Sequence, residues 1–197
     1  MAIYSFNHDS FGKTTNRACD TLRADPMADK IRILVLNGSN INLFGRREPH
    51  IYGNITLEEI NSRLRNLAAE IGAELIFLQS NHEGVLLDGL HSHRDDVDGA
   101  ILNPGGMTWN SNALHDAINA MPFPVIEVHM SNLAAREEWR QRSAISPAAK
   151  GVIQGLNWRS YTAALRALFE MILESRESGA TAETSSATND FHKKYEK

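Results

Sequence analysis

A long polar stretch from Asn37 to Gly53, NGSNINLFGRREPHIYG, carries the residues best suited to chemistry. Arg46, Arg47 and Tyr52 lie within it, and a tyrosine beside a fixed positive charge can act as a base because that charge favours the phenolate. A connection of this length is typical of a binding loop or a lid. A solvated loop with an aromatic anchor fits the same residues, so the stretch alone leaves both interpretations open.

His129 is a second candidate for proton transfer, because it directly follows the apolar run PVIEV. A histidine can serve as a general acid or base near neutral pH. It can also be held by a backbone carbonyl in a purely structural role. Glu127 lies two residues earlier and therefore points to the same side of a strand. It is placed either to orient the imidazole or to pair with another buried group.

Gly105 and Gly106 precede a predicted helix, where free backbone N–H groups would suit an anion such as a carboxylate. A tight turn that requires glycine is the alternative. His91 and His93 are spaced like a metal-binding pair, but side chains at i and i+2 of a helix diverge, so we interpret them as surface residues. The sequence lacks the G-x-G-x-x-G, G-x-x-x-x-G-K-[ST] and G-x-S-x-G motifs. We expect no cofactor and no metal.

The bulk composition is that of one globular domain. Of 197 residues, 42% are hydrophobic and 22% are charged. The net charge of -4 provides no basic field, which argues against nucleic acid as a partner. A single cysteine, Cys19, excludes a disulfide framework, and no apolar run is long enough to cross a membrane. The first residues also lack the apolar region of a secretory signal, so we expect a soluble, cytoplasmic protein.

Five short apolar runs alternate with helical patterns between two polar ends. We predict strands at 31–36, 74–79, 99–102, 124–128 and 151–155, and helices at 56–71, 83–93, 111–121, 134–142 and 158–175. The first helix should begin with a capping box of Thr56 and Glu59 and end at Gly72. Residues 1–30 are predicted to be a flexible N-terminal extension and residues 176–197 a disordered C-terminal tail. One catalytic domain is expected over residues 31–175.

This alternation favours a parallel sheet with helices on both faces. For five units we predict an α/β, flavodoxin-like fold with strand order 2-1-3-4-5. Ligands of such sheets bind beyond the carboxyl ends of the strands. Asn40, Asn103, His129 and Ser131 follow strands 1, 3 and 4, which are neighbours in this order. Their side chains should therefore meet at one rim of the sheet.

Several motifs, in this order along the chain, resemble those of type II 3-dehydroquinate dehydratases. They are the stretch from Asn37 to Gly53 and then QSNHEG, ILNPGG, EVHMSN and AREEWRQRS, and together they cover about residues 31–173. The resemblance implies a flavodoxin-like enzyme without metal or cofactor that assembles from trimers into a homododecamer. It also implies a hydro-lyase of the shikimate or quinate pathway, which dehydrates 3-dehydroquinate to 3-dehydroshikimate by anti elimination through an enolate.

The resemblance assigns the proton transfers to four residues of this sequence. Tyr52 would take the C2 proton of the substrate, and Arg47 would lower its pKa. Asn40 would stabilise the enolate oxygen, and His129 would protonate the departing C1 hydroxyl. All four residue types are present at the matching positions.

The resemblance also implies which residues hold the substrate. Asn103, Ser131 and the backbone near Met130 would bind the carboxylate, and Arg140 would bind ring hydroxyls. Asp116 would reach into the site of a neighbouring subunit, which makes a homo-oligomer the expected assembly.

Three positions depart from the family pattern. Trp109 stands where the family has a histidine that reads a substrate hydroxyl, His115 replaces an arginine, and Ser39 replaces a proline. An indole N–H can donate one hydrogen bond but cannot accept one. The sequence therefore leaves three hypotheses: a divergent dehydroquinate dehydratase, a related dehydratase of another β-hydroxy ketone acid, and a catalytically silent protein that binds a small molecule.

Overall fold

The computed structural model describes residues 30–47, 51 and 53–193, with side chains as far as Ser178. Within that part of the chain, five parallel strands form one sheet in the order β2-β1-β3-β4-β5. The predicted flavodoxin-like strand order is therefore confirmed. Tyr52 and residues 1–29 of the predicted N-terminal extension lie outside the described residues. The strands are β1 (Ile31–Ser39), β2 (Ala73–Gln79), β3 (Gly99–Gly105), β4 (Val125–His129) and β5 (Gly151–Gln154).

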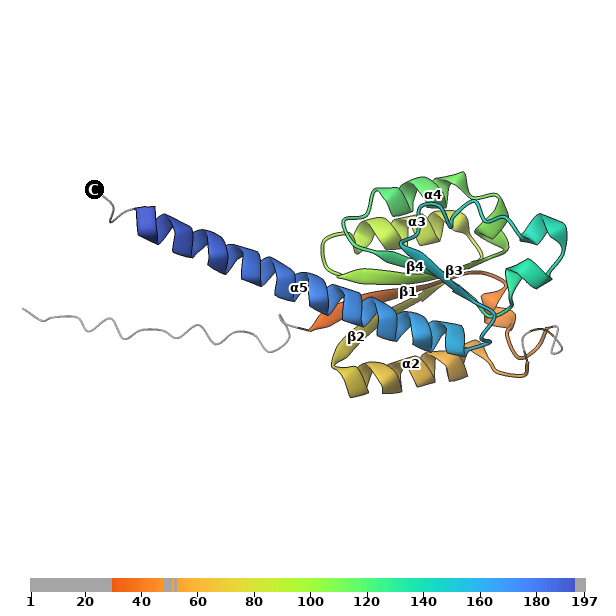
Figure 1. The fold of residues 1–197 in the computed structure, drawn as a ribbon. Helices are drawn as coiled ribbons and strands as arrows, with labels where there is room; N and C mark the ends of the chain where they lie inside the picture. The colour runs from red at the N-terminus through yellow and green to blue at the C-terminus, as the bar shows by residue number, and fades with distance from the viewer. Residues whose placement is uncertain (1–29, 48–50, 52, 194–197) are drawn as a thin grey trace, which may run out of the picture.

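Helices cover both faces of the sheet. They are α2 (Leu57–Ile71), α3 (Glu83–Ser92), α4 (Asn112–Asn119) and α5 (Arg159–Lys193). Figure 1 shows α3 and α4 on one face and α2 and α5 on the other. Each layer buries its own hydrophobic cluster against the sheet. The result is the three-layer arrangement expected of alternating strands and helices.

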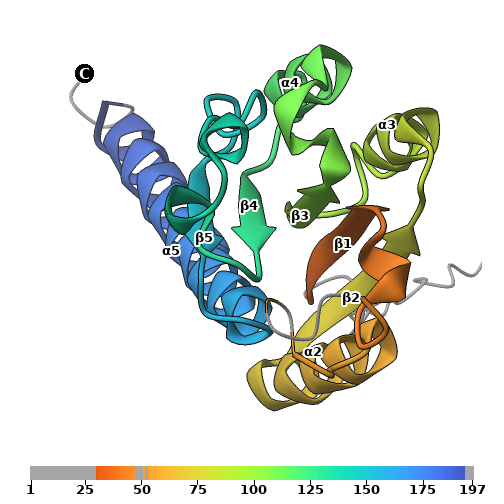
Figure 2. The same ribbon diagram turned by 90° about the vertical axis from the view of Figure 1, so that its right-hand side faces the viewer.

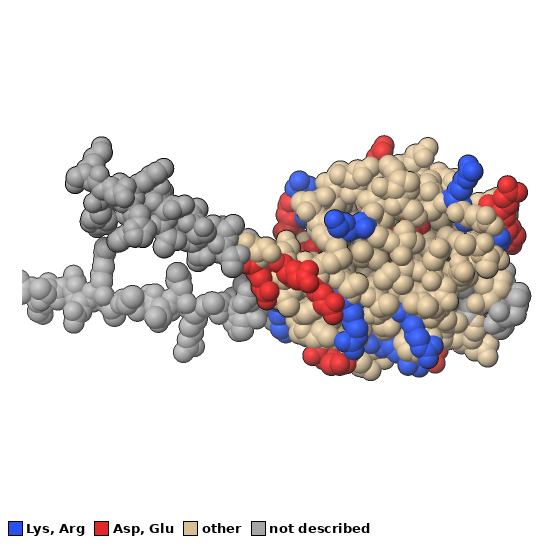
Figure 3. Space-filling model, in the orientation of Figure 1, with Lys and Arg blue, Asp and Glu red and all other residues tan. Residues whose placement is uncertain are grey.

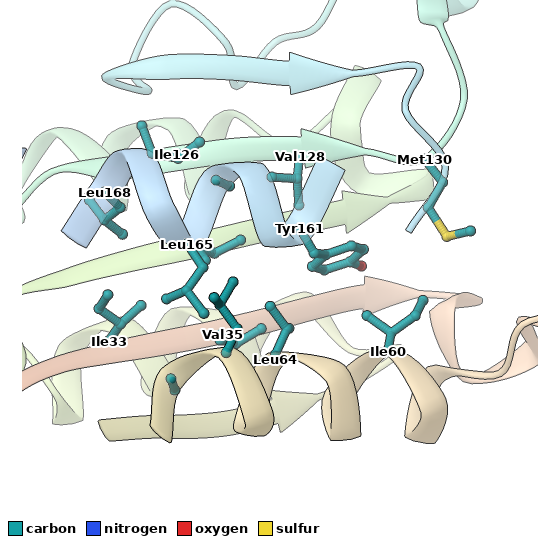
Figure 4. Packing of buried hydrophobic residues seen from close by; sticks show 14 of the residues in the cluster. Ile33, Val35, Ile60, Leu64, Ile126, Val128, Met130, Tyr161, Leu165 and Leu168 are labelled. Carbon is teal, nitrogen blue, oxygen red and sulfur yellow. The ribbon is translucent and has the colours of Figure 1, made fainter. Parts of the chain in front are cut away.

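Strand β1 explains why the apolar run near the start of the chain is nearly continuous. Ile33 and Val35 are buried toward α2 and α5, whereas Leu34 and Leu36 are buried toward α3 and α4. Figure 4 shows the first of these clusters, where helix side chains such as Leu165 meet β1. Burial of one such side chain contributes about 1.5–3 kcal/mol. Strand β1 is thereby held between the two helix layers, which fixes the position of its carboxyl end.

Local signals at the ends of α2 form as the sequence predicts. The Thr56 hydroxyl accepts from the backbone N–H of Glu59 at 3.2 Å, and the Glu59 carboxylate accepts from the backbone N–H of Thr56 at 2.8 Å. This is the predicted capping box. Gly72 ends the helix with φ of 81°, a left-handed conformation that glycine adopts without a steric cost.

The helix predicted over residues 134–142 is wrong. The segment forms two short 3-10 helices, η3 (Leu133–Ala135) and η4 (Glu138–Arg140), separated by an extended Arg136. Leu133 is the buried residue of η3, and η4 buries none of its residues. A helix in a protein is stabilised mainly by packing an apolar face, which this charged segment does not have.

Two further boundaries differ from the prediction. Strand β3 continues through Gly105 instead of ending at Leu102, because Ser39 of β1 pairs with Gly105. Helix α5 remains helical to Lys193, past the predicted end at Ser175, and its later part extends beyond the sheet in Figure 1. The disorder predicted for residues 176–197 remains a prediction.

The surface carries both signs of charge. In the space-filling view of Figure 3, Lys and Arg side chains are interspersed with Asp and Glu side chains over the face that carries α5. Among the described residues, no helix is both long enough and apolar enough to span a bilayer.

Candidate active site

A pocket of about 210 Å³ lies at the carboxyl ends of β1, β3 and β4. Figure 2 shows the molecule from this end, where the ends of the neighbouring strands β1, β3 and β4 lie together. The volume suits a molecule smaller than a typical drug-sized ligand. Eight of the predicted site residues line it: Asn40, Arg47, Asn103, Trp109, His129, Met130, Ser131 and Arg140. The convergence at one rim that was predicted for Asn40, Asn103, His129 and Ser131 is therefore confirmed.

Glu127 supports His129 from beneath the pocket. Both side chains are buried, and His129 Nε2 lies 2.7 Å from Glu127 Oε1. Ser143 donates to Glu127 Oε1 at 2.9 Å and Ser146 donates to Oε2 at 2.5 Å. Burial favours the neutral carboxyl, but the hydrogen bonds from His129, Ser146 and Ser143 together outweigh it and lower the pKa of Glu127. Glu127 is therefore a carboxylate at neutral pH.

The ionised carboxylate determines how the imidazole is used. A carboxylate can only accept hydrogen bonds, so the Nε2 atom of His129 carries the proton that faces Glu127. Nδ1 is then the ring nitrogen that exchanges a proton with a molecule in the pocket. Of the two roles that the sequence leaves open for Glu127, the structure shows the contact with His129. The sequence did not reveal Ser143 and Ser146, because a serine more than a dozen residues away gives no local signal.

Asn40 stands where β1 turns into the long loop. Its φ of 66° is left-handed, a conformation that asparagine tolerates better than most residues. Its backbone N–H donates to Asn81 Oδ1 at 2.8 Å, which ties the start of the loop to the segment after β2. The side chain of Asn40 is exposed and lines the pocket. Arg47 also lines the pocket and is half-buried, five residues before Tyr52.

Of the two interpretations of Gly105 and Gly106, the anion site is the one that the structure contradicts. The N–H of Gly105 donates to Asn103 Oδ1 at 3.2 Å, and the N–H of Gly106 donates to Ser39 Oγ at 2.9 Å. Both donors are already used inside the chain. Gly105 has φ of 59°, and a Cβ there would collide with the carbonyl oxygen of Ser39. The alternative, a tight turn that requires glycine, describes this segment.

Trp109 is part of an aromatic wall. Its Nε1 donates to the backbone carbonyl of Arg140 at 2.8 Å, and its ring meets the ring of Trp139 edge-on at 4.9 Å between centroids. The guanidinium of Arg140 lies 4.8 Å from the Trp109 ring centre and 4.0 Å from that of Trp139. Its Nε also forms an ion pair with Glu137 at 3.0 Å, without the alignment of a hydrogen bond. Trp139, which is 58% exposed, was not recognised from the sequence.

Ser131 and Met130 line the pocket beside His129. The Ser131 hydroxyl accepts from Arg136 Nη1 at 3.3 Å, so a third arginine, beside Arg47 and Arg140, lines the pocket. Arg136 lies in the segment that the sequence predicted to be a helix over residues 134–142. Its inward position follows from the break between η3 and η4.

Asp116 lies away from the pocket of its own chain. It is exposed on α4, and its neighbour His115 places Nδ1 2.8 Å from the carbonyl oxygen of Ala144. The expectation that Asp116 completes a neighbouring subunit's site stays a prediction. Among the described residues, no cluster of three or more His, Cys, Asp or Glu side chains could hold a metal ion.

Comparison with known proteins agrees with this geometry. The family model for dehydroquinase class II matches residues 31–169. A 3-dehydroquinate dehydratase of Roseiflexus castenholzii is 47% identical over 149 residues, which is 76% of this chain and 92% of that protein. The 3-dehydroquinate dehydratase 1 of Agrobacterium fabrum is 51% identical over 136 residues, which is 69% of this chain and 94% of that protein.

Solved structures give the same result. The crystal structure of the type II dehydroquinase from Butyrivibrio crossotus superposes with a TM-score of 0.69 at 36% identity, and covers 71% of this chain and 97% of its own. The type II dehydroquinase from Propionibacterium acnes superposes with a TM-score of 0.68 at 38% identity, covering 71% of this chain and 97% of its own. The family model covers most of the chain, and the relatives named above match it along nearly their whole length. The chain therefore belongs to the class II dehydroquinase family.

Proposed function

We propose that the protein is a hydro-lyase that converts 3-dehydroquinate to 3-dehydroshikimate. The observation that carries this proposal is the buried His129–Glu127 pair in a pocket that also contains Arg47 and Asn40, in a chain of the class II dehydroquinase family. The family match does not favour the two alternatives raised by Trp109, a dehydratase of another β-hydroxy ketone acid and a silent binding protein.

In this proposal Tyr52 removes the C2 proton as a phenolate. A free tyrosine has a pKa of about 10, so ionising it at neutral pH costs roughly 4 kcal/mol. The positive charge of Arg47, at the pocket end of the same loop, offsets part of that cost. The loop thus supplies both the base and the charge that activates it.

The electrons of the broken C–H bond move to the ketone oxygen and form an enolate. Asn40 lines the pocket where β1 ends and can donate to that oxygen as its charge develops. The enolate then re-forms the ketone and expels the C1 hydroxyl, leaving a C1–C2 double bond. His129 gives that hydroxyl a proton, so it leaves as water, while Glu127 stabilises the imidazole.

The remaining pocket residues hold the substrate in this scheme. Asn103, Ser131 and the backbone at Met130 surround the place of the carboxylate. Arg140 provides hydrogen bonds to ring hydroxyls, and contacts with the rings of Trp109 and Trp139 hold its guanidinium in place. A guanidinium that is already held in place loses less conformational freedom when the substrate binds, which strengthens binding.

The assay is direct. Purified protein mixed with 3-dehydroquinate should produce the conjugated enone, which is followed by its new ultraviolet absorbance. His129→Ala should remove this activity, whereas His93→Ala should keep it, since His93 pairs with Asp96 at 3.0 Å on the surface. No enone at high enzyme concentration would refute the substrate assignment.

We also propose a homo-oligomer built from trimers, in which Asp116 contacts the pocket of the next subunit, and a cytoplasmic location. The exposure of Asp116 on α4, outside its own pocket, supports the first of these. Light scattering coupled to gel filtration should give a mass that is a multiple of three chains. A monomer that retains full activity would contradict the shared site.

A further inference from the structure

Tyr161 is a buried polar residue that the proposed reaction does not use. It lies on α5 with none of its surface exposed, and Figure 4 shows its ring among the apolar side chains between that helix and β1. Its hydroxyl oxygen lies 2.7 Å from Asn37 Oδ1 and 2.7 Å from Asn103 Nδ2. Asn37 and Asn103 pair with each other near the carboxyl ends of β1 and β3 and are 1% and 2% exposed. A phenol in this core is costly unless both its hydrogen-bonding capacities are used.

The direction of every hydrogen bond in this chain of groups is determined. The N–H of Gly105 can only donate, so the Asn103 atom facing it at 3.2 Å is the oxygen. Asn103 Nδ2 therefore faces Tyr161 and donates to it. The single hydroxyl proton of Tyr161 then goes to Asn37 Oδ1. Burial raises the pKa of Tyr161 well above its ordinary value, against the opposing effect of the Asn103 hydrogen bond, so the hydroxyl keeps this proton.

This arrangement leaves Asn103 with one N–H that is not used by Tyr161. Asn103 lines the pocket, beside Ser131 and Met130. If the amide were rotated by half a turn, two donors would face each other at Gly105, and the pocket side of the side chain would present an acceptor. A carboxylate needs the donor, so the orientation of this amide determines whether the position attracts or repels it.

We propose that Tyr161 is a positioning residue that holds the amide of Asn103 so that its free N–H faces the substrate carboxylate. This proposal rests on the proposed function in one respect, which is that the carboxylate is that of 3-dehydroquinate. Tyr161 itself does not touch the substrate. Its hydroxyl lies on α5 and accepts a hydrogen bond from Asn103 Nδ2, so its effect on the substrate is exerted through Asn103.

The test separates this role from general stability. Tyr161→Phe removes the hydroxyl and keeps the ring. Leu168→Val is the matched control, because Leu168 is buried in the same cluster two turns further along α5 and takes no part in these hydrogen bonds. Steady-state kinetics with 3-dehydroquinate as the substrate give KM and kcat for both variants and for the wild type. Affinities are measured by calorimetry for quinate, whose hydroxyl in place of the ketone prevents enolate formation, and for methyl quinate, which lacks the carboxylate.

Tyr161→Phe should raise KM and weaken quinate binding by roughly tenfold, the effect of a misdirected hydrogen bond to a charged group, with little change in kcat. Methyl quinate should bind the wild type and this variant equally, and Leu168→Val should change none of these values. An unchanged KM, an equal loss for methyl quinate, or an equal effect of Leu168→Val would overturn the proposal.

The proposal for Tyr161 can still be tested if the wild type is inactive or if the variant does not fold. If the wild type does not dehydrate 3-dehydroquinate, the proposed function fails, and the comparison of quinate binding still decides the role of Tyr161. If Tyr161→Phe does not fold, a crystal structure of the wild type with quinate decides it. Asn103 Nδ2 within hydrogen-bonding distance of the carboxylate supports the proposal, and an Asn103 side chain that makes no contact with the carboxylate overturns it.

Discussion

Trp109 gives its only side-chain N–H to the backbone carbonyl of Arg140, and the guanidinium of Arg140 lies over the Trp109 ring. The indole therefore has no polar group left for a substrate hydroxyl. Its effect on the pocket is exerted through Arg140, which it holds together with Trp139. The tryptophan that departs from the family histidine thus belongs to the support of an arginine rather than to direct recognition of a hydroxyl.

Removal of this support should weaken substrate binding. Trp109→Ala leaves Arg140 without one of its two stacking partners, and a cation–π contact of this kind is worth about 0.5–2 kcal/mol, so we expect KM to rise by roughly two- to thirtyfold. The matched control is Trp158→Ala. Trp158 stacks with Arg63 at 4.3 Å and Arg159 at 4.5 Å, outside the pocket lining. A KM that rises equally in both variants would show that the effect is not specific to the pocket.

Glu127→Gln should lower kcat on the order of 10²-fold, because an amide no longer fixes the Nε2 proton of His129 and can stabilise the wrong tautomer. Steady-state kinetics with 3-dehydroquinate measures this. Glu70→Gln serves as the control, since Glu70 forms an exposed ion pair with Arg166 at 3.5 Å. If Glu127→Gln turned over as fast as the wild type, the imidazole would not depend on Glu127.

The same carboxyl makes stability depend on pH. The folded protein lowers the pKa of Glu127 below its unfolded value of about 4.3, so Glu127 stabilises the fold above that value. This contribution is lost as the pH falls through the folded pKa. The difference in unfolding free energy between the wild type and Glu127→Gln should therefore shrink from about pH 6 to about pH 3 in urea titrations. A difference that stays constant or grows toward acid would contradict this assignment.

Gly105→Ala should destabilise the protein by more than about 2 kcal/mol, because a side chain at a positive φ meets the carbonyl of Ser39. It should also weaken substrate binding, since the Gly105 N–H orients Asn103. Gly84→Ala is the control. A Cβ at Gly84, in the first turn of α3, meets no atom within 4 Å and should be neutral or stabilising. Equal melting temperatures for the two variants would show that β1 can move away from a side chain at position 105 without a loss of stability.

The fold could be predicted because its signals are local and repeated. The apolar run of β1, the capping box at Thr56 and Glu59, and the glycine at position 72 each indicate an element within a few residues. The break at Arg136 could not be predicted in this way. It depends on contacts with Ser131 and Glu137 that form only after folding.

The site was predictable where residues sit at strand ends. Asn40, Asn103, His129 and Ser131 meet because parallel strands share one carboxyl edge. Tyr161 lies in the helix predicted over residues 158–175, but the sequence did not reveal its role. Its hydroxyl bonds Asn37, 124 positions away, and no sequence pattern reports a contact of that separation. The use of the Gly106 N–H by Ser39 was missed for the same reason.

Tyr52 carries the central claim, since it is the proposed base, and Tyr52→Phe tests it with the loss of a single oxygen. Turnover of 3-dehydroquinate should fall by a factor on the order of 10³ or more, while the affinity for quinate stays close to that of the wild type. A Tyr52→Phe protein that still dehydrates 3-dehydroquinate at a rate near that of the wild type would contradict the proposed mechanism.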